Sequence, residues 1–396
     1  MSLISIFTNH FSLKLKNKNI LVISPQNWGT MYLSKHHYSI ELARRGNKVF
    51  FLNPPDQNKE LPGNKVIIKP SGVHENLFVI SHRSWFPFRL KFHWRWGFDK
   101  LMRTHIAKIK AALPVSPDIV WSFDIGNILP LKNFPDSSFK VFHPVDEPLL
   151  QEAIDAAEGA QVIFSVTREI ISKYHIYDVP RHFVHHGVAG EFVRKFEQGS
   201  YSINNPLRVG YAGNMMRQDI DRSILLRILR ENPDIVFNFF GSYKLKDGNL
   251  GGGADESTIG FMQALEQLPN VKLHGVLDQE KLAKEFATLD AFLICYDIKK
   301  DPSRGTNYHK LMEYFATGRV VISNNITTYN DRPDLIMMTI ERDNNESLPA
   351  LFKSVVANIE KHNRLELQEI RKKFAASNTY CRQMDRIEGL LEPVMK

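Results

Sequence analysis

The feature that most limits the fold of this chain is a regular alternation of short apolar runs with helical stretches. Residues 19–24 form one such run, residues 34–45 follow with helical spacing that ends at Gly46, and residues 48–52 form a second run. Apolar runs this short are typical of parallel strands that are buried on both faces. The order strand, helix, strand therefore predicts a doubly wound α/β sheet, which binds ligands at the carboxyl ends of its strands.

The alternation occurs in two blocks of the 396 residues, separated by a polar, turn-rich segment at residues 194–206. A chain of this length is expected to hold two or three domains. We therefore expect an α/β protein with two Rossmann-like, doubly wound domains. The first would cover residues 1–195, the second would cover residues 205–375, and a C-terminal helix would cover residues 376–396.

Composition excludes several other classes of protein. No apolar run approaches the roughly 20 residues that cross a bilayer. The two cysteines, Cys295 and Cys381, are too few for a disulfide framework and favour a reducing compartment. The first lysines follow a short apolar stretch, whereas a signal peptide has its charges before a longer one. These features predict a cytoplasmic protein.

Basic charge is concentrated in the first half of the chain. The net charge is +8, and residues 1–200 hold 25 Lys and Arg against 17 Asp and Glu. Residues 83–110 interleave basic side chains with Trp and Phe, a combination that suits the headgroup region of an anionic membrane. We expect a membrane-facing surface there, formed by Trp85, Arg89, Lys91, Trp94, Arg95 and Trp96. The alternative is an amphipathic helix with its aromatic side chains in the core. Since no nucleic-acid-binding motif occurs, we expect no nucleic-acid partner.

A glycine-containing turn follows the first apolar run of the second half. It spans residues 210–217 and includes Gly213, Asn214 and Arg217. Glycine at a strand-to-helix turn lets backbone N–H groups approach a phosphate, and an arginine can bind a diphosphate. Asp219 and Asp221 have the spacing of a metal-binding pair, but they lie where a helix should begin, so helix capping is the favoured interpretation. We expect no metal site.

A second motif lies at the start of a helix predicted for residues 310–316. Lys310 and Glu313 are three residues apart, so they share one face of the first turn. At the carboxyl edge of a sheet, a lysine can bind a phosphate and a carboxylate can accept two hydroxyls of a ribose. The alternative is an ordinary ion pair on a surface helix, worth about 0.2–0.5 kcal/mol.

Together these segments resemble nucleotide-sugar glycosyltransferases of the GT-B fold, in particular the bacterial family-4-like enzymes. The match to their Lys-x-x-Glu-Tyr segment consists of Lys310, Glu313, Tyr314, Ala316, Gly318, Val320 and Val321. Further pieces occur in the family's order at residues 28–29, 145–147, 186–188, 210–214, 274–276 and 290–296. The proline that usually precedes the lysine is absent, and Gly305 stands where these enzymes often have a first acidic residue.

The resemblance implies two domains that face an interdomain cleft, with the last segment of the chain crossing back onto the first domain. It implies a nucleoside-diphosphate sugar as co-substrate, with a UDP-sugar favoured, and no metal or other cofactor. Donor-binding residues would be Gly213, Asn214, Arg217, Gly275, Tyr296, Lys310 and Glu313. The acceptor, a glycolipid or glycan, would lie near Asn27, Gly29 and Asp124. The first candidate for the catalytic base is Asp146, followed by Glu147, Asp124 and His37.

The implied activity is transfer of a sugar to a lipid-linked or polysaccharide acceptor in bacterial surface glycan synthesis. The basic stretch would then hold the enzyme in peripheral contact with the anionic inner surface of the cytoplasmic membrane. Two alternatives stay open: a non-catalytic nucleotide-sugar-binding protein, and a sugar-nucleotide epimerase of the same fold. Retention or inversion at the anomeric carbon also stays open.

Overall fold

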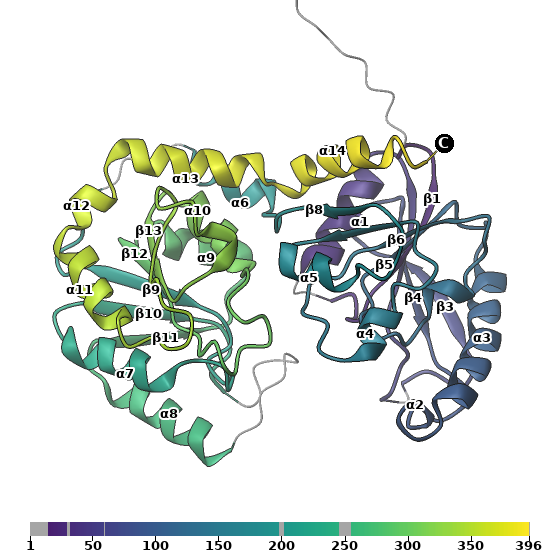
Figure 1. The fold of residues 1–396 in the computed structure, drawn as a ribbon, viewed down its shortest axis with the longest axis horizontal. Helices are drawn as coiled ribbons and strands as arrows, with labels where there is room; N and C mark the ends of the chain where they lie inside the picture. The colour runs from purple at the N-terminus through teal and green to yellow at the C-terminus, as the bar shows by residue number, and fades with distance from the viewer. Residues whose placement is uncertain (1–14, 30–31, 59, 198–201, 245–254, 396) are drawn as a thin grey trace, which may run out of the picture. The chain divides into compact units, whose positions relative to one another are not determined.

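The computed structural model describes residues 15–29, 32–58, 60–197, 202–244 and 255–395 (Figure 1). Residues 1–14, which contain the short apolar stretch compared above with a signal peptide, lie outside these residues. Two compact units are present. The first comprises Met1–Ser165, Ile171–Val184 and Met384–Lys396, and the second comprises Val166–Ile170 and His185–Gln383. Each unit is built around its own sheet, which is parallel apart from one edge pairing in the first unit.

The sheet of the first unit has eight strands in the order β3-β4-β2-β1-β5-β6-β7-β8. They are β1 (Asn19–Ile23), β2 (Lys48–Leu52), β3 (Val66–Pro70), β4 (Leu77–His82), β5 (Ile119–Ser122), β6 (Phe139–Phe142), β7 (Val162–Ser165) and β8 (Arg181–Phe183). Strands β3 and β4 pair antiparallel, and the other pairings are parallel. Strand β2 lies on one side of β1 and β5 on the other, so the carboxyl ends of β1 and β5 form a topological switch point.

Helix α1 connects β1 to β2, as the alternation predicts. The helices of this part of the chain are α1 (Ser34–Arg44), α2 (Leu90–His93), α3 (Arg95–Ala112), α4 (Gln151–Asp155) and α5 (Arg168–Lys173). Tyr38 of α1 is buried against Trp121 and Phe123, with ring centroids 6.2 and 6.0 Å apart. This aromatic packing fixes the face that α1 turns toward the sheet.

The sheet of the second unit has six strands in the order β11-β10-β9-β12-β13-β14, and its pairings are parallel. The strands are β9 (Arg208–Ala212), β10 (Val236–Phe240), β11 (Val271–Gly275), β12 (Ala291–Ile294), β13 (Val320–Ser323) and β14 (Ile336–Met338). The switch point lies between β9 and β12. Both motifs found in the sequence are therefore at this sheet, since β9 leads into the glycine turn and the Lys310 helix leads into β13.

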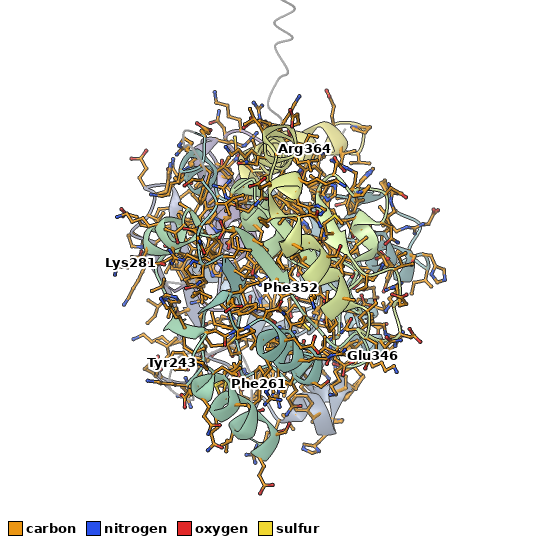
Figure 2. All side chains as sticks on the ribbon, turned by 90° about the vertical axis from the view of Figure 1, so that its left-hand side faces the viewer. Tyr243, Phe261, Lys281, Glu346, Phe352 and Arg364 are labelled. Carbon is orange, nitrogen blue, oxygen red and sulfur yellow. The ribbon has the colours of Figure 1, made fainter. Side chains whose placement is uncertain are left out.

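Helices cover both faces of the second sheet, and a separate apolar core lies under each layer. On one face lie α7 (Arg222–Glu231), α8 (Glu256–Gln267) and α11 (Leu348–Ala357), which contribute Phe261 and Phe352 to their core (Figure 2). On the other face lie α6 (Gly190–Arg194), α9 (Gln279–Phe286), α10 (Lys310–Ala316) and α13 (Leu365–Ser377). Two further helices are α12 (Ile359–His362) and α14 (Tyr380–Leu391). Because both faces are covered, the fully buried strands β12 and β13 read as nearly continuous apolar runs.

The units divide at different places from the domain boundaries expected from the sequence. Helix α6 belongs to the second unit, because Phe192 packs into that unit's core against Phe286, with ring centroids 6.0 Å apart. Residues 384–396 belong to the first unit, whereas residues 376–383 belong to the second. Arg45, which follows α1, helps to hold residues 384–396 on the first unit, since it forms ion pairs with Asp385 and Glu388 at 2.7 and 2.8 Å.

Across the part of the chain that the structure describes, no helix combines the length and the apolar character that crossing a membrane requires.

Candidate functional site

The Lys310 motif owes its geometry to a buried tyrosine. Tyr314 of α10 is 1% exposed, and its hydroxyl accepts a hydrogen bond from the N–H of Ala212, the last residue of β9, at 2.8 Å. Its ring stacks on Phe292 of β12 with centroids 4.2 Å apart. These contacts lock α10 against two strand ends and thereby position Lys310, one turn before Tyr314, and Glu313 at the start of the helix. Their charged groups are 3.0 Å apart, and their side chains are 27% and 21% exposed.

Three glycines occupy neighbouring strand ends beside this helix, and we call them the glycine row: Gly213 after β9, Gly241 after β10 and Gly275 at the end of β11. The N–H of Gly213 donates to the carbonyl of Phe240 at 2.9 Å, and the N–H of Gly241 donates to that of Gly275 at 2.7 Å. A Cβ added to Gly241 would lie 1.9 Å from the Gly213 oxygen, so only glycine fits there. The row leaves a stretch of backbone uncovered by its own side chains.

Sequence reasoning found Gly213 and Gly275 but missed Gly241. A signal for it was present, because Gly241 follows the apolar run 236–240 in the same way that Gly213 follows the run of β9. What the sequence does not show is that the two turns touch, since this requires the parallel pairing of β9 with β10.

The predicted diphosphate ligand Arg217 already has an anionic partner. Its guanidinium binds the carboxylate of Asp219, with Nε 2.8 Å from Oδ1, and this pairing raises the pKa of Arg217. The guanidinium also lies over the ring of Tyr296, 5.7 Å from the centroid. Tyr296 in turn contacts Tyr308, with ring centroids 4.8 Å apart, and burial raises the pKa of Tyr296 to about 12. The structure thus brings Arg217 and Tyr296 together and holds both in place.

The remaining predicted groups near the glycine turn have structural partners. Asn214 closes its own turn, because its Oδ1 accepts a hydrogen bond from the N–H of Met216 at 2.9 Å. Asp221 caps α7 by accepting from the N–H of Ile224, which confirms the capping interpretation for this residue. Among the described residues, no group of three or more His, Cys, Asp or Glu side chains is arranged to hold a metal ion.

The candidates for the catalytic base in the first unit differ in exposure and in their partners. Asp146 lies four residues after β6, at the carboxyl edge of the sheet, and is exposed. Glu147 differs, because one of its carboxylate oxygens binds the Lys173 ammonium and its side chain is only 6% exposed. The geometry therefore favours Asp146 over Glu147.

Asp124 serves the loop in which it lies. Its carboxylate Oδ2 accepts hydrogen bonds from the N–H groups of Ile128 and Leu129 at 2.8 and 3.1 Å. The side chain is buried, and this burial raises the pKa of Asp124. Asp124 therefore stabilises the loop after β5. We had expected it to face an acceptor instead.

The loop after β1 is held by a histidine that the sequence did not single out. His36 Nδ1 accepts from the N–H of Leu33 at 3.1 Å, while Nε2 lies 3.1 Å from the Asn27 carbonyl oxygen. This assignment requires a neutral ring, and burial lowers the pKa of His36 to about 4. Asn27 and Gly29 are exposed in this loop, and His37 is half-buried on α1.

The basic and aromatic segment presents four exposed rings, which we call the aromatic face. These are Trp85, Phe92, Trp94 and Trp96, which are 53%, 69%, 53% and 67% exposed. Trp85 precedes α2, Phe92 lies in α2, Trp94 lies between the two helices and Trp96 lies in α3. Figure 1 shows this helix pair. Arg89 is also exposed. The alternative in which these aromatic side chains fill the core is therefore wrong for the three tryptophans of this segment.

Two of the basic residues expected on the aromatic face point elsewhere. Lys91 is buried, and its ammonium donates to the carbonyl of Gly126 at 2.6 Å. Arg95 donates to the carbonyl of Asn127 at 2.9 Å. Both also pair with Glu152, at 3.4 and 3.3 Å. This corrects their assignment to a membrane-facing surface, because these charges anchor the helix pair to the loop after β5.

Comparison with known proteins gives matches in structure alone. No known family profile matches the chain, and no curated protein sequence matches it. Sucrose-phosphate synthase from Thermosynechococcus elongatus matches with a TM-score of 0.67 and 12% identity, covering 95% of this chain and 99% of that one. HepE from Anabaena, in complex with UDP and glucose, gives 0.64 and 12% over the same shares. The lipopolysaccharide outer core galactosyltransferase WaaB gives 0.61 and 12%, again over 95% and 99%.

These structures are glycosyltransferases of the GT-B fold, and the chain has their fold. The expected class, an α/β protein with two Rossmann-like domains, is confirmed by this likeness and by the two parallel sheets.

Proposed function

We propose that this protein is a glycosyltransferase that takes a sugar from a nucleoside-diphosphate sugar, with a UDP-sugar as the favoured donor. One observation carries the proposal: α10 presents Lys310 and Glu313 beside the glycine row, at the carboxyl edge of the second sheet. The likeness to structures such as the UDP complex of HepE supports the choice of nucleotide. The acceptor proposed is a lipid-linked or polysaccharide glycan of the bacterial surface.

In this proposal the diphosphate lies along the glycine row, where the three glycines have no side chains of their own to cover the strand ends. Lys310 meets a phosphate oxygen, and Glu313 accepts hydrogen bonds from the ribose hydroxyls. Arg217, held by Asp219 and by the ring of Tyr296, adds positive charge nearby. Fixed donors of this kind stabilise the charge that develops on the leaving diphosphate, and no metal is required for it.

For the acceptor we propose Asp146 as the base that removes the hydroxyl proton if the enzyme inverts configuration. It is exposed at the carboxyl edge of the first sheet, whereas the carboxylates of Glu147 and Asp124 are engaged within the protein. His37, the last of the expected candidates, becomes the second one, since it lies on α1, which follows the carboxyl end of β1. The test is the turnover number of Asp146→Asn, which should fall by at least about tenfold. A turnover number equal to that of the wild type would remove Asp146 from this role.

We further propose peripheral contact of the aromatic face with the anionic cytoplasmic surface of a membrane. Exposed tryptophans fit the headgroup region, and the net charge of +8 favours anionic lipid. The measurement is co-sedimentation with vesicles that contain phosphatidylglycerol, compared with vesicles of phosphatidylcholine alone. Replacing Trp94 and Trp96 by Ser should abolish binding, whereas Leu365→Ser, a change at an equally exposed apolar residue of the second unit, should leave it intact. Equal loss in both variants would contradict the proposal.

The donor proposal is tested by calorimetric titration with UDP, GDP and ADP. Glu313→Ala should weaken binding of the preferred nucleotide by about tenfold or more, because a hydrogen bond to a charged group contributes about 1.5–3 kcal/mol. The matched control is Glu369→Ala, which removes the acid of another i,i+3 ion pair with Lys372 at 3.5 Å. Absence of binding by all three nucleotides would refute the proposal. Binding without sugar transfer to any acceptor would indicate a nucleotide-sugar-binding protein instead.

A further inference from the structure

The buried lysine Lys35 stands at the switch point of the first sheet. It lies in the first turn of α1, three residues before Tyr38, so the two side chains share one face of the helix. Tyr38 packs against His143 and Phe123, which directly follow β6 and β5, with ring centroids 5.2 and 6.0 Å apart. Lys35 lies one turn closer to the start of α1 than Tyr38. We therefore expect it near the carboxyl ends of β5 and β6, where Asp146 follows His143 in the chain.

The ammonium of Lys35 has no partner among the residues that the structure describes. The residue is 2% exposed, and its Nζ forms no hydrogen bond and no ion pair with the described residues, although the nitrogen itself is not fully shut off from solvent. Burial lowers the pKa of Lys35 to about 8, and the negative charge of Asp146 opposes this change without contacting the ammonium. A buried cation without a partner is costly for a folded protein, so it is typical of a site completed by a ligand.

We propose that Lys35 binds a phosphate group carried by the acceptor. The inference rests on the proposed function, since it names the chemical class of the acceptor at the first unit. A lysine ammonium is a compact charge with three donors, and a phosphate oxygen supplies the acceptors that this ammonium lacks. The location agrees, because doubly wound sheets bind ligands at the switch point between strands such as β1 and β5.

In this arrangement the phosphate and the reacting hydroxyl have separate partners. Lys35 holds the anion below the surface, and exposed Asp146 faces the solvent side of the same edge. An acceptor with a phosphate beside its sugar would be oriented by the first contact and deprotonated at the second. Lys35 is thus an acceptor-binding and specificity-determining residue, and neutral glycans should be poor substrates.

The test uses inorganic phosphate as the probe and the full chain. Unfolding is followed by tryptophan fluorescence in phosphate-free buffer and with increasing phosphate, for wild type, Lys35→Met and Lys310→Met. Because methionine removes a charge without a partner and keeps the apolar stem, Lys35→Met should be at least as stable as wild type without phosphate. Phosphate should stabilise wild type and Lys310→Met, and its Kd should rise about tenfold or more in Lys35→Met. Hydrogen exchange of residues 32–40 should slow with phosphate in the same two proteins.

Several outcomes would overturn the proposal. Destabilisation of Lys35→Met without phosphate would make the lysine a structural residue. No effect of phosphate on wild type, or an equal effect on all three proteins, would exclude a site at Lys35. Loss of the effect in Lys310→Met alone would place the phosphate in the second unit. UDP binding is measured separately on the same proteins, so a failure of the donor proposal is recognised independently.

Discussion

Removal of one hydroxyl, in Tyr314→Phe, tests how α10 is positioned. The substitution keeps the ring and its stacking on Phe292 but leaves the N–H of Ala212 without its acceptor. Both residues are buried, at 1% and 6% exposure, so water cannot replace the lost partner. An unsatisfied buried donor costs about 1–3 kcal/mol, and we expect Tyr314→Phe to lose that much free energy of unfolding. Because α10 carries Lys310 and Glu313, nucleotide affinity should fall as well.

The chain supplies a matched control in Tyr329→Phe. Tyr329 is also 1% exposed and belongs to the same core, but its hydroxyl finds no hydrogen-bond partner among the described residues. Removing it should change stability by no more than about 0.5 kcal/mol, or should stabilise the protein. The assay is urea unfolding followed by circular dichroism, together with hydrogen exchange of the Ala212 amide. Equal losses in the two variants, or an unchanged Ala212 exchange rate in Tyr314→Phe, would refute the reasoning.

Three further predictions concern the backbone contact at Gly241, the ion pairs of Arg45 and the pH dependence that His36 causes. Gly241→Ala should destabilise the second unit by about 2–5 kcal/mol, since the added Cβ would overlap a backbone oxygen and the residue has a φ of +132°. The control, Gly260→Ala in α8, has open space around it and should stabilise the protein by about 0.5–1 kcal/mol. Both changes are measured by urea unfolding. Arg45→Met should lower the melting temperature by leaving Glu388 largely buried without its ion-pair partner, and Arg45→Met with Glu388→Gln should recover most of the loss. The pKa of His36 is about 4 in the folded state, which is lower than its pKa of 6.5 in the unfolded chain. As the pH falls, the unfolded chain therefore takes up the proton first. We expect this group to remove about 2 kcal/mol of stability between about pH 7.5 and about pH 5, and tryptophan-monitored unfolding of His36→Gln should show a correspondingly weaker pH dependence.

Much of the fold could be predicted because buried parallel strands leave a direct signal in the sequence. The apolar run 48–52 has the same bounds as β2, and the helix expected at residues 310–316 has the same bounds as α10. Strand β3 (Val66–Pro70) was not predicted, and its burial explains why. It pairs antiparallel at the edge of its sheet and has no fully buried residue, so it lacks the continuous apolar run of the central strands.

The candidate site could be predicted in part. The spacing of Lys310 and Glu313 determined that they share a face, and the structure places their charges 3.0 Å apart. The sequence did not show that Arg217 has a carboxylate partner in Asp219, or that Lys91 turns inward. Such outcomes depend on where neighbouring segments lie, because a long flexible side chain can point to solvent or to any polar group within its reach.

The sequence by itself determined the alternation of strand and helix, the two blocks and the position of the motifs, because these follow from local periodicity and from glycine at turns. Only the tertiary structure decided which of the charged and polar groups are buried and what they meet. Tyr314 and Ala212 are 102 residues apart, and Tyr38 of α1 packs against Phe123 and His143, which follow two other strands of its sheet. The cost of burying a charge or a hydrogen-bonding group depends on partners brought together by folding, and no local pattern records them.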